Sequence, residues 1–178
     1  MGSSSPDPLR SLPRIFLTDI DTDEMSVELP SHEFKKVHDV LRLRSGAEIA
    51  ILPNNGTILR CTLEGRRAVI QEQIHLPTES SKFVRLALAI PKPEKLEESV
   101  RLATEIGVSE IVIFPSRRTV VKWNAEKLEN RLQRLNAIAR EAAEVSFRSK
   151  LPVIHTAKNL NDLLQTFPEA VVMSESDK

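Results

Sequence analysis

The chain has 178 residues, of which 40% are hydrophobic and 28% charged, and its 25 basic residues balance 25 acidic ones. This composition excludes a disordered, collagen-like or coiled-coil chain, and the length suits one large domain or two small ones. The single cysteine, Cys61, excludes a disulfide framework and a cysteine-based zinc site, and it is typical of the reducing cytoplasm. No apolar run approaches the roughly 20 residues of a membrane span, so we expect no membrane partner.

The first part of the chain begins with a tail, a strand and a helix. Residues 1–12 are rich in serine and proline and predict a disordered tail, and the apolar residues that follow predict a strand over residues 13–18. Ser31 occupies a position typical of a helix N-cap, and Glu33 stands in the first turn. Apolar residues at helical spacing then continue to Leu41.

An Asn-Gly pair at residues 55–56 stands between two β-like runs and predicts a hairpin. Its strands are expected over residues 49–51 and 58–63, and a further pair of strands around residues 68–74. Residues 13–76 therefore predict a small β-rich unit with one helix.

After Pro77 the periodicity changes and predicts alternating strands and helices, which indicates a parallel α/β sheet. Residues 83–90 are almost continuously apolar, which is typical of a strand buried on both faces. A helix follows, with Gly107 at its C-terminal end, and Asn124 begins a second, longer helix. The other expected elements are strands over residues 108–114, 153–154 and 170–173, and a short helix that begins at Asn159 or Asn161.

Glycine usage limits the kinds of ligand site. The chain has five glycines and none after Gly107, whereas a P-loop or a G-x-G-x-x-G turn needs several. Ligands of open α/β sheets bind beyond the carboxyl ends of the strands, and the chain stops soon after Met173, where the next such loop is expected. We therefore expect an incomplete second domain.

No cluster of side chains points to one catalytic chemistry. The four histidines lack the spacing of a metal site, so no metal is expected, and no general base is identified. Cys61 lies in a predicted strand, where a structural thiol is more common than a nucleophile. Glu97, Glu98 and Glu105 are candidate acid or base groups, and the alternative is that they are ordinary exposed helix carboxylates.

Charge is distributed unevenly along the chain. Residues 117–150 contain nine basic and four acidic residues, a net charge of +5, whereas residues 1–75 contain nine basic and eleven acidic ones. This asymmetry predicts a local anionic partner, and the alternative is a long helix with a solvated charged face. Basic residues near the ends of predicted elements, where they suit phosphate contacts, are Arg42, Arg44, Lys92, Lys95, Arg117 and Arg118.

Motifs that carry a family resemblance lie at residues 92–97 (K-P-E-K-L-E) and 103–108 (A-T-E-I-G-V). Further segments that agree in order and spacing are residues 14–16, 40–46, 116–121 and 138–152. From Arg14 onward, the chain resembles the RsmE family of SPOUT-superfamily methyltransferases. It departs from the family pattern at Lys36, Pro93, Val145 and Phe147.

The resemblance implies an α/β protein with a PUA-like β-barrel over residues 13–76 that binds RNA, followed by a SPOUT domain over residues 77–178. It implies methyl transfer from S-adenosylmethionine to N3 of a uridine in 16S ribosomal RNA, with the small ribosomal subunit as partner and no metal. The residues then expected to contact RNA are Arg42, Arg44, Lys92, Lys95, Arg118, Arg140 and Arg148.

Two cofactor motifs of the family, G-P-E-G-G and L-G-x-R-I-L-R-x-E-T-A, are absent from the 178 residues. They belong to the trefoil knot that holds S-adenosylmethionine, so we expect a member truncated before its knot and inactive by itself, with Ser174 and Glu175 at the edge of the cofactor pocket. The alternative is a non-catalytic RNA-binding module that has lost the cofactor-binding half. The resemblance also implies dimer contacts through the knot, so a full-length counterpart is expected to be a homodimer and this chain to be monomeric or only weakly dimeric.

Overall fold

The computed structural model describes residues 8–116 and 125–173, which form two compact units. Unit 1 contains the chain up to Lys82 together with Arg140–Leu151, and unit 2 contains Phe83–Ala139 and the chain from Pro152 onward. Unit 1 thus extends past the boundary expected after residue 76 and includes a segment from much later in the chain.

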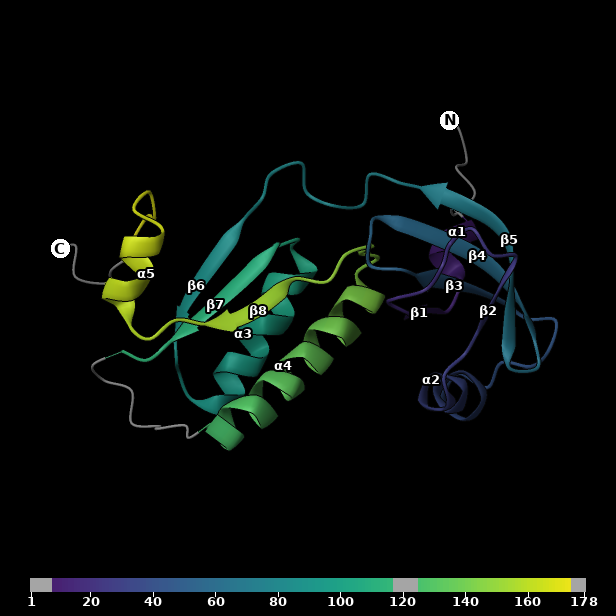
Figure 1. Ribbon diagram of the computed structural model, residues 1–178, viewed down its shortest axis with the longest axis horizontal. Coiled ribbons are helices and arrows are strands. Elements are labelled where there is room, and N and C mark those ends of the chain that lie inside the picture. Colours follow the sequence, from purple (N-terminus) through teal and green to yellow (C-terminus); the bar gives the residue numbers. More distant parts are fainter. Residues whose placement is uncertain (1–7, 117–124, 174–178) are drawn as a thin grey trace, which may run out of the picture. The chain divides into compact units, whose positions relative to one another are not determined.

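Unit 1 is built on a five-stranded sheet with the strand order β1-β3-β4-β5-β2 (Figure 1). β1 pairs with β3 in parallel, and the other neighbours are antiparallel. The strands are β1 (Arg14–Phe16), β2 (Ser26–Glu28), β3 (Glu48–Leu52), β4 (Thr57–Glu64) and β5 (Arg67–His75). The predicted hairpin is confirmed between β3 and β4, whereas the expected strand pair around residues 68–74 is the single strand β5.

The helical elements of unit 1 are α1 (Pro8–Ser11), α2 (Ser31–Lys35) and the π-helical turn η1 (Lys36–Val40). The helix predicted from Ser31 is confirmed, but its N-cap is Pro30. Ser31 is the first residue of the helix instead, and its hydroxyl accepts a hydrogen bond from Arg66 Nη2 at 3.1 Å. α1 lies inside the predicted tail, so regular structure begins earlier than expected.

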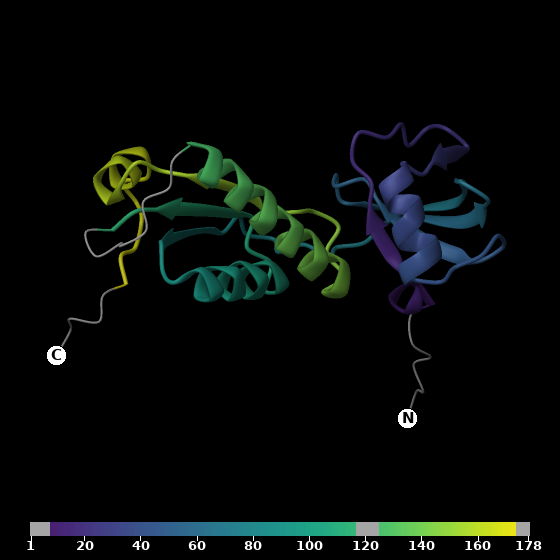
Figure 2. The ribbon, with the colours of Figure 1, turned by 90° about the horizontal axis from the view of Figure 1, so that it is seen from below.

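Both faces of this sheet carry apolar side chains because alternate residues of a strand point to opposite faces. On one face, buried residues such as Ile49 and Ile51 join a cluster with Val37 of η1, which lies beside the strands in Figure 2. On the other face, Phe16 and Ile58 join a cluster with Ala143 from the segment Arg140–Leu151. The late segment therefore supplies part of the core of unit 1.

A buried ion pair also holds this segment. The Arg148 side chain is only 5% exposed, and its Nη2 donates to Glu79 Oε2 at 2.7 Å. Glu79 Oε1 accepts from the backbone N–H groups of Ser149 and Lys150 at 2.7 and 2.9 Å. Burial raises the pKa of Glu79, but the hydrogen bond and charge of Arg148 and the two backbone donors outweigh it, so the pKa lies below its ordinary value.

Unit 2 contains the predicted parallel α/β sheet, with the strand order β6-β7-β8 (Figure 1). Ile111 and Ile113 of the fully buried β7 pack with residues of α3 and α4, whereas Val112 and Phe114 pack with α5 on the opposite face. Gly107 follows α3 with φ +93°, and the Asn159 side chain caps α5. The elements are β6 (Arg85–Ala89), α3 (Pro93–Glu105), β7 (Glu110–Phe114), α4 (Ala125–Val145), β8 (Val153–Thr156) and α5 (Leu160–Thr166).

Two expectations for unit 2 are wrong. The strand predicted as buried on both faces is β6, an edge strand of the described sheet, whose side chains on one face (Arg85, Ala87 and Ala89) are exposed. No strand forms over residues 170–173, where Val171 and Met173 are 90% and 96% exposed. Apolar character alone does not make a strand when no neighbouring strand completes its backbone hydrogen bonds.

We predict that Glu79→Gln lowers the free energy of unfolding near pH 7 by about 3 kcal/mol, because it removes the carboxylate charge that faces the buried Arg148 guanidinium. The depressed pKa of Glu79 contributes stability that is present above its ordinary pKa of 4.5 and is lost as the pH falls through the folded-state pKa. The difference between wild type and variant should therefore shrink near pH 3. Urea unfolding followed by circular dichroism at both pH values measures it.

The matched control is Glu48→Gln, which breaks an exposed ion pair to Arg60 and should cost less than about 1 kcal/mol. An equal decrease in the free energy of unfolding in the two variants would contradict a stabilising role of the Glu79–Arg148 ion pair. So would a Glu79→Gln effect that is as large near pH 3 as near pH 7.

Candidate nucleic-acid interface

Two exposed lysines, Lys92 and Lys95, lie at the N-cap and in the first turn of α3, just after β6. Lys92 is the N-cap residue of α3, where the backbone N–H groups of the first turn have no partner within the helix and the helix dipole is positive. Lys95 Nζ lies 2.8 Å from Glu98 Oε2, and the hydrogen bond and charge of Glu98 raise the pKa of Lys95. Because both side chains are exposed, both predicted RNA contacts are accessible to an anionic ligand.

A single carboxylate of α3 binds two arginines of α4. Glu97 Oε1 accepts from Arg134 Nε at 2.6 Å and from Arg131 Nη1 at 3.0 Å. The hydrogen bond from Arg134 is the main reason that the pKa of Glu97 is lowered, and the nearby guanidinium charges add to it. Glu97 is thus held as an ionised partner of arginines, which is a structural role.

Arg140 belongs to a polar network within unit 1. Its Nη2 donates to Glu33 Oε1 at 2.5 Å and to the backbone oxygen of Phe16. Glu144, one turn later, accepts from Lys36 Nζ at 2.6 Å and from the backbone N–H of Phe16 at 3.2 Å. Glu33 and Glu144 are both buried, so the network ties the end of α4 to β1 and to α2.

The basic segment predicted over residues 117–150 is therefore largely paired where the structure describes it. Arg131 and Arg134 bind Glu97, Arg140 binds Glu33, and Arg148 binds Glu79. The net charge of residues 117–150 does not show this pairing, because the partner carboxylates lie outside that segment. Because their guanidinium groups are engaged by carboxylates and their side chains are only 30% and 5% exposed, we leave Arg140 and Arg148 out of the RNA-binding surface proposed below.

Arg42 and Arg44 lie in the loop after η1, and both are exposed. Arg42 has a φ of +56°, a left-handed conformation that turns the chain out of the helix. Arg44 Nη1 donates to the backbone oxygens of His38 and Leu43 at 3.1 and 3.3 Å, which holds this side chain beside η1.

A pocket of about 250 Å³ opens beside Arg44. The rings of Phe34 and His38 are stacked on its wall, with 5.6 Å between centroids and 26° between planes. Arg66 lies outside the lining, with Cζ 5.6 Å from the centre of the Phe34 ring. Sequence reasoning missed Phe34, His38 and Arg66 as site residues, although the four-residue spacing of the two rings places them on one helix face.

Several residues that were assigned a role from the sequence lie outside the described ranges. Arg118, predicted to contact RNA, and Ser174 and Glu175, predicted at the cofactor pocket, are among them. Among residues 8–116 and 125–173, no group of three or more His, Cys, Asp or Glu side chains is placed to hold a metal ion. No helix in the same ranges is long and apolar enough to span a membrane.

Cys61 is fully buried on β4, with Sγ 3.7 Å from the backbone oxygen of Leu59. Burial raises the pKa of the thiol to about 12. Since the thiolate is the nucleophilic form, Cys61 is a structural residue of the core of unit 1, as the sequence predicted.

Comparison of the sequence with known families identifies the family of this chain. A family model described as an RNA methyltransferase domain matches residues 78–178. The chain belongs to this RNA methyltransferase family, and the resemblance recognised from its motifs is confirmed.

Two curated relatives are both named ribosomal RNA small subunit methyltransferase E. The Bacillus subtilis protein is 28% identical over 155 residues, which cover 83% of this chain and 60% of the relative. The Mesomycoplasma hyopneumoniae protein is 33% identical over 141 residues, which cover 78% of this chain and 62% of the relative. The chain therefore spans about 60% of the length of these relatives.

Solved structures show the same fold. A ribosomal RNA small subunit methyltransferase E from Neisseria gonorrhoeae, bound to S-adenosyl methionine, superposes with a TM-score of 0.82 at 24% identity, covering 93% of this chain and 71% of that chain. A putative methyltransferase from Legionella pneumophila, also in complex with its cofactor, gives a TM-score of 0.79 at 21% identity, covering 86% of this chain and 66% of that chain.

We predict that Cys61 in the folded protein does not react with a thiol reagent such as iodoacetamide near pH 8, because its pKa of about 12 leaves almost no thiolate and the side chain is buried. Unfolding in urea should restore ordinary thiol reactivity. Mass spectrometry of the alkylated chain, with and without urea, measures both states. Rapid labelling of the folded protein would show that Cys61 is accessible and reactive.

Proposed function

We propose that this protein is an S-adenosylmethionine-dependent methyltransferase that acts on N3 of a uridine in the 16S RNA of the small ribosomal subunit, in the cytoplasm. The observation that carries the proposal is the family match over residues 78–178, together with the name shared by the curated relatives. We further assign residues 13–76 to a PUA-like RNA-binding domain and residues 77–178 to part of a SPOUT domain.

The residues of this chain would bind and orient RNA. Exposed cations suited to phosphate oxygens lie in two places. They are Lys92 and Lys95 at the start of α3 in unit 2, and Arg42 and Arg44 in the loop after η1 in unit 1. Methylation requires the uridine N3 proton to be removed and the base to be held in line with the methyl donor, so positioning supplies much of the rate.

The described residues do not fit tight binding of the cofactor by themselves. Pro91 and Pro93 follow β6 and Pro115 follows β7, so the turns at the carboxyl ends of these strands lack backbone N–H donors at three positions. No glycine after Gly107 allows the backbone to wrap a ligand closely. S-Adenosylmethionine supplies the methyl group in this reaction, and we derive no step through it here.

The poor fit of the described residues to the cofactor supports a second candidate, a non-catalytic RNA-binding module that retains the exposed lysines and arginines. A methylation assay on small-subunit RNA with labelled S-adenosylmethionine separates the two. We propose in addition that these 178 residues are monomeric or only weakly dimeric and that a counterpart carrying the knot motifs is a homodimer.

We predict that binding of a structured RNA hairpin weakens steeply with salt. If four to six phosphates are contacted, log K should fall by roughly 0.7 to 0.9 per contact for each unit of log salt concentration. Lys92→Gln with Lys95→Gln should weaken binding and reduce that slope by about 1.5, because two contacts are lost. Fluorescence anisotropy between about 50 and 200 mM salt measures it.

The control is Lys82→Gln with Arg101→Gln, which removes two exposed charges that lie outside the proposed contacts. Binding that does not depend on salt, or equal effects of the two double variants, would contradict the proposed phosphate contacts.

We predict that these 178 residues bind S-adenosylmethionine with a Kd no better than about 1 mM, near −4 kcal/mol. The reason is the shortage of backbone donors and glycines described above. Titration calorimetry measures the affinity. A micromolar Kd would show that the described turns and the remaining residues form a complete pocket.

A further inference from the structure

The pocket beside Arg44 is small and lies wholly within unit 1. Its volume of about 250 Å³ lies below the roughly 300–1,000 Å³ of pockets that hold drug-sized ligands. This volume is too small for a complete nucleotide cofactor and suits one planar heterocycle. The pocket therefore differs in kind from a cofactor site.

Its lining has the chemistry of a stacking site. The stacked rings of Phe34 and His38 form the wall, and the His38 side chain is 45% exposed. His38 Nδ1 lies 2.7 Å from Asp39 Oδ1, a contact that orients the imidazole ring. The lining also includes Val37 and Leu63, each only 2% exposed, so a planar ring placed here would meet apolar atoms as well as aromatic ones.

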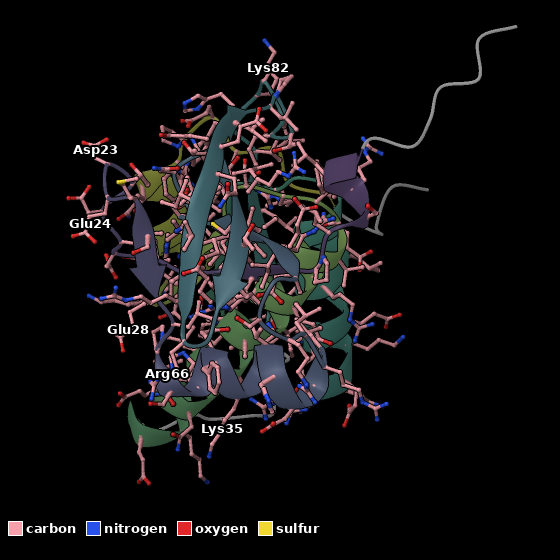
Figure 3. The ribbon with its side chains drawn as sticks, turned by 90° about the vertical axis from the view of Figure 1, so that its right-hand side faces the viewer. Asp23, Glu24, Glu28, Lys35, Arg66 and Lys82 are labelled. Carbon is pink, nitrogen blue, oxygen red and sulfur yellow. The ribbon has the colours of Figure 1, made fainter. Side chains whose placement is uncertain are left out.

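Three arginines are associated with the pocket. Arg44 lines the pocket, Arg42 precedes it by two residues, and Arg66 lies over Phe34. Figure 3 shows Arg66 and Lys35 beside α2. Figure 3 also shows Asp23 and Glu24 on the loop at the far end of β2.

The acidic side chains nearest to the pocket in sequence are Asp39, which pairs with His38, and Glu64, between the lining residues Leu63 and Gly65. The lining itself contains one arginine, Arg44, and no carboxylate, so the surface complements a ligand with phosphates next to a planar ring.

We propose that this pocket receives one unpaired nucleobase of single-stranded RNA, which stacks against the Phe34–His38 ring pair while Arg42, Arg44 and Arg66 contact the neighbouring phosphates. Unpaired bases are commonly bound by stacking on aromatic side chains and guanidinium planes, and stacking tolerates any base because each has a π face. This inference rests on the proposed RNA-binding function and names the RNA element that unit 1 recognises.

The test compares two single-stranded ligands on the full 178-residue chain. One is an RNA of about eight uridines, within the roughly 4–16 nucleotides that single-stranded sites cover, and the other is an abasic ribose-phosphate chain of equal length. Wild type should bind the uridine RNA roughly 5- to 150-fold more tightly, the factor expected for one stacked base. Fluorescence anisotropy at fixed salt measures both affinities.

His38→Ala should remove most of that preference and leave binding of the abasic chain nearly unchanged. Arg44→Gln should weaken both ligands, because it removes a phosphate contact. Arg60→Gln is the matched control, since Arg60 is in unit 1 but is paired with Glu48 at 2.7 Å and does not line the pocket. Circular dichroism confirms that each variant is folded, and an NMR shift of the His38 ring protons on adding the uridine RNA reports occupancy of the pocket without any substitution.

The outcomes separate this inference from the proposed function. Equal, salt-dependent binding of the two ligands by wild type would overturn the base pocket while leaving electrostatic RNA binding in place. A preference that survives His38→Ala, without an NMR shift of His38, would also overturn it. Failure of wild type to bind either ligand would overturn both proposals.

Discussion

Buried pairing between carboxylates and arginines is the constraint on which unit 1 depends. Glu79 holds Arg148, and Glu33 holds Arg140, so the segment Arg140–Leu151 is joined to the N-terminal sheet at two points. Each charge is costly to bury alone and acceptable when paired, so each partner needs the other. The apolar contacts of Ala143 with the sheet are formed between these two anchors.

This architecture changes how the charge of the molecule relates to RNA binding. Arginines are abundant late in the chain, yet the described ones there are bound to carboxylates and act within the fold. Exposed cations that suit phosphate contacts lie where β6 leads into α3, at Lys92 and Lys95, and in the loop after η1, at Arg42 and Arg44. A protein with no net charge can therefore still offer local cationic surfaces, because charges act over a short range in salt.

Local patterns in the sequence predicted most of the elements. The hairpin before β4, the helix from Ser31, and the strand β7 are confirmed because their signals come from turn residues and apolar periodicity within a few positions. The roles of Arg140 and Arg148 could not be read in this way, since their partners Glu33 and Glu79 lie 107 and 69 residues away. The exposure of one face of β6 depends on which distant elements pack over it, and the residues of the strand do not encode that.

The discontinuity of unit 1 has a consequence for its folding during synthesis. The five strands are complete once His75 has been made, but the Arg140–Leu151 segment that covers one face follows much later. At roughly 5–20 residues per second, the ribosome needs several seconds to deliver it. During that interval Phe16 and Ile58 lack their apolar partner Ala143, and Glu33 and Glu79 lack their arginines. The nascent sheet therefore passes through a period in which one apolar face is open to chaperones or to aggregation.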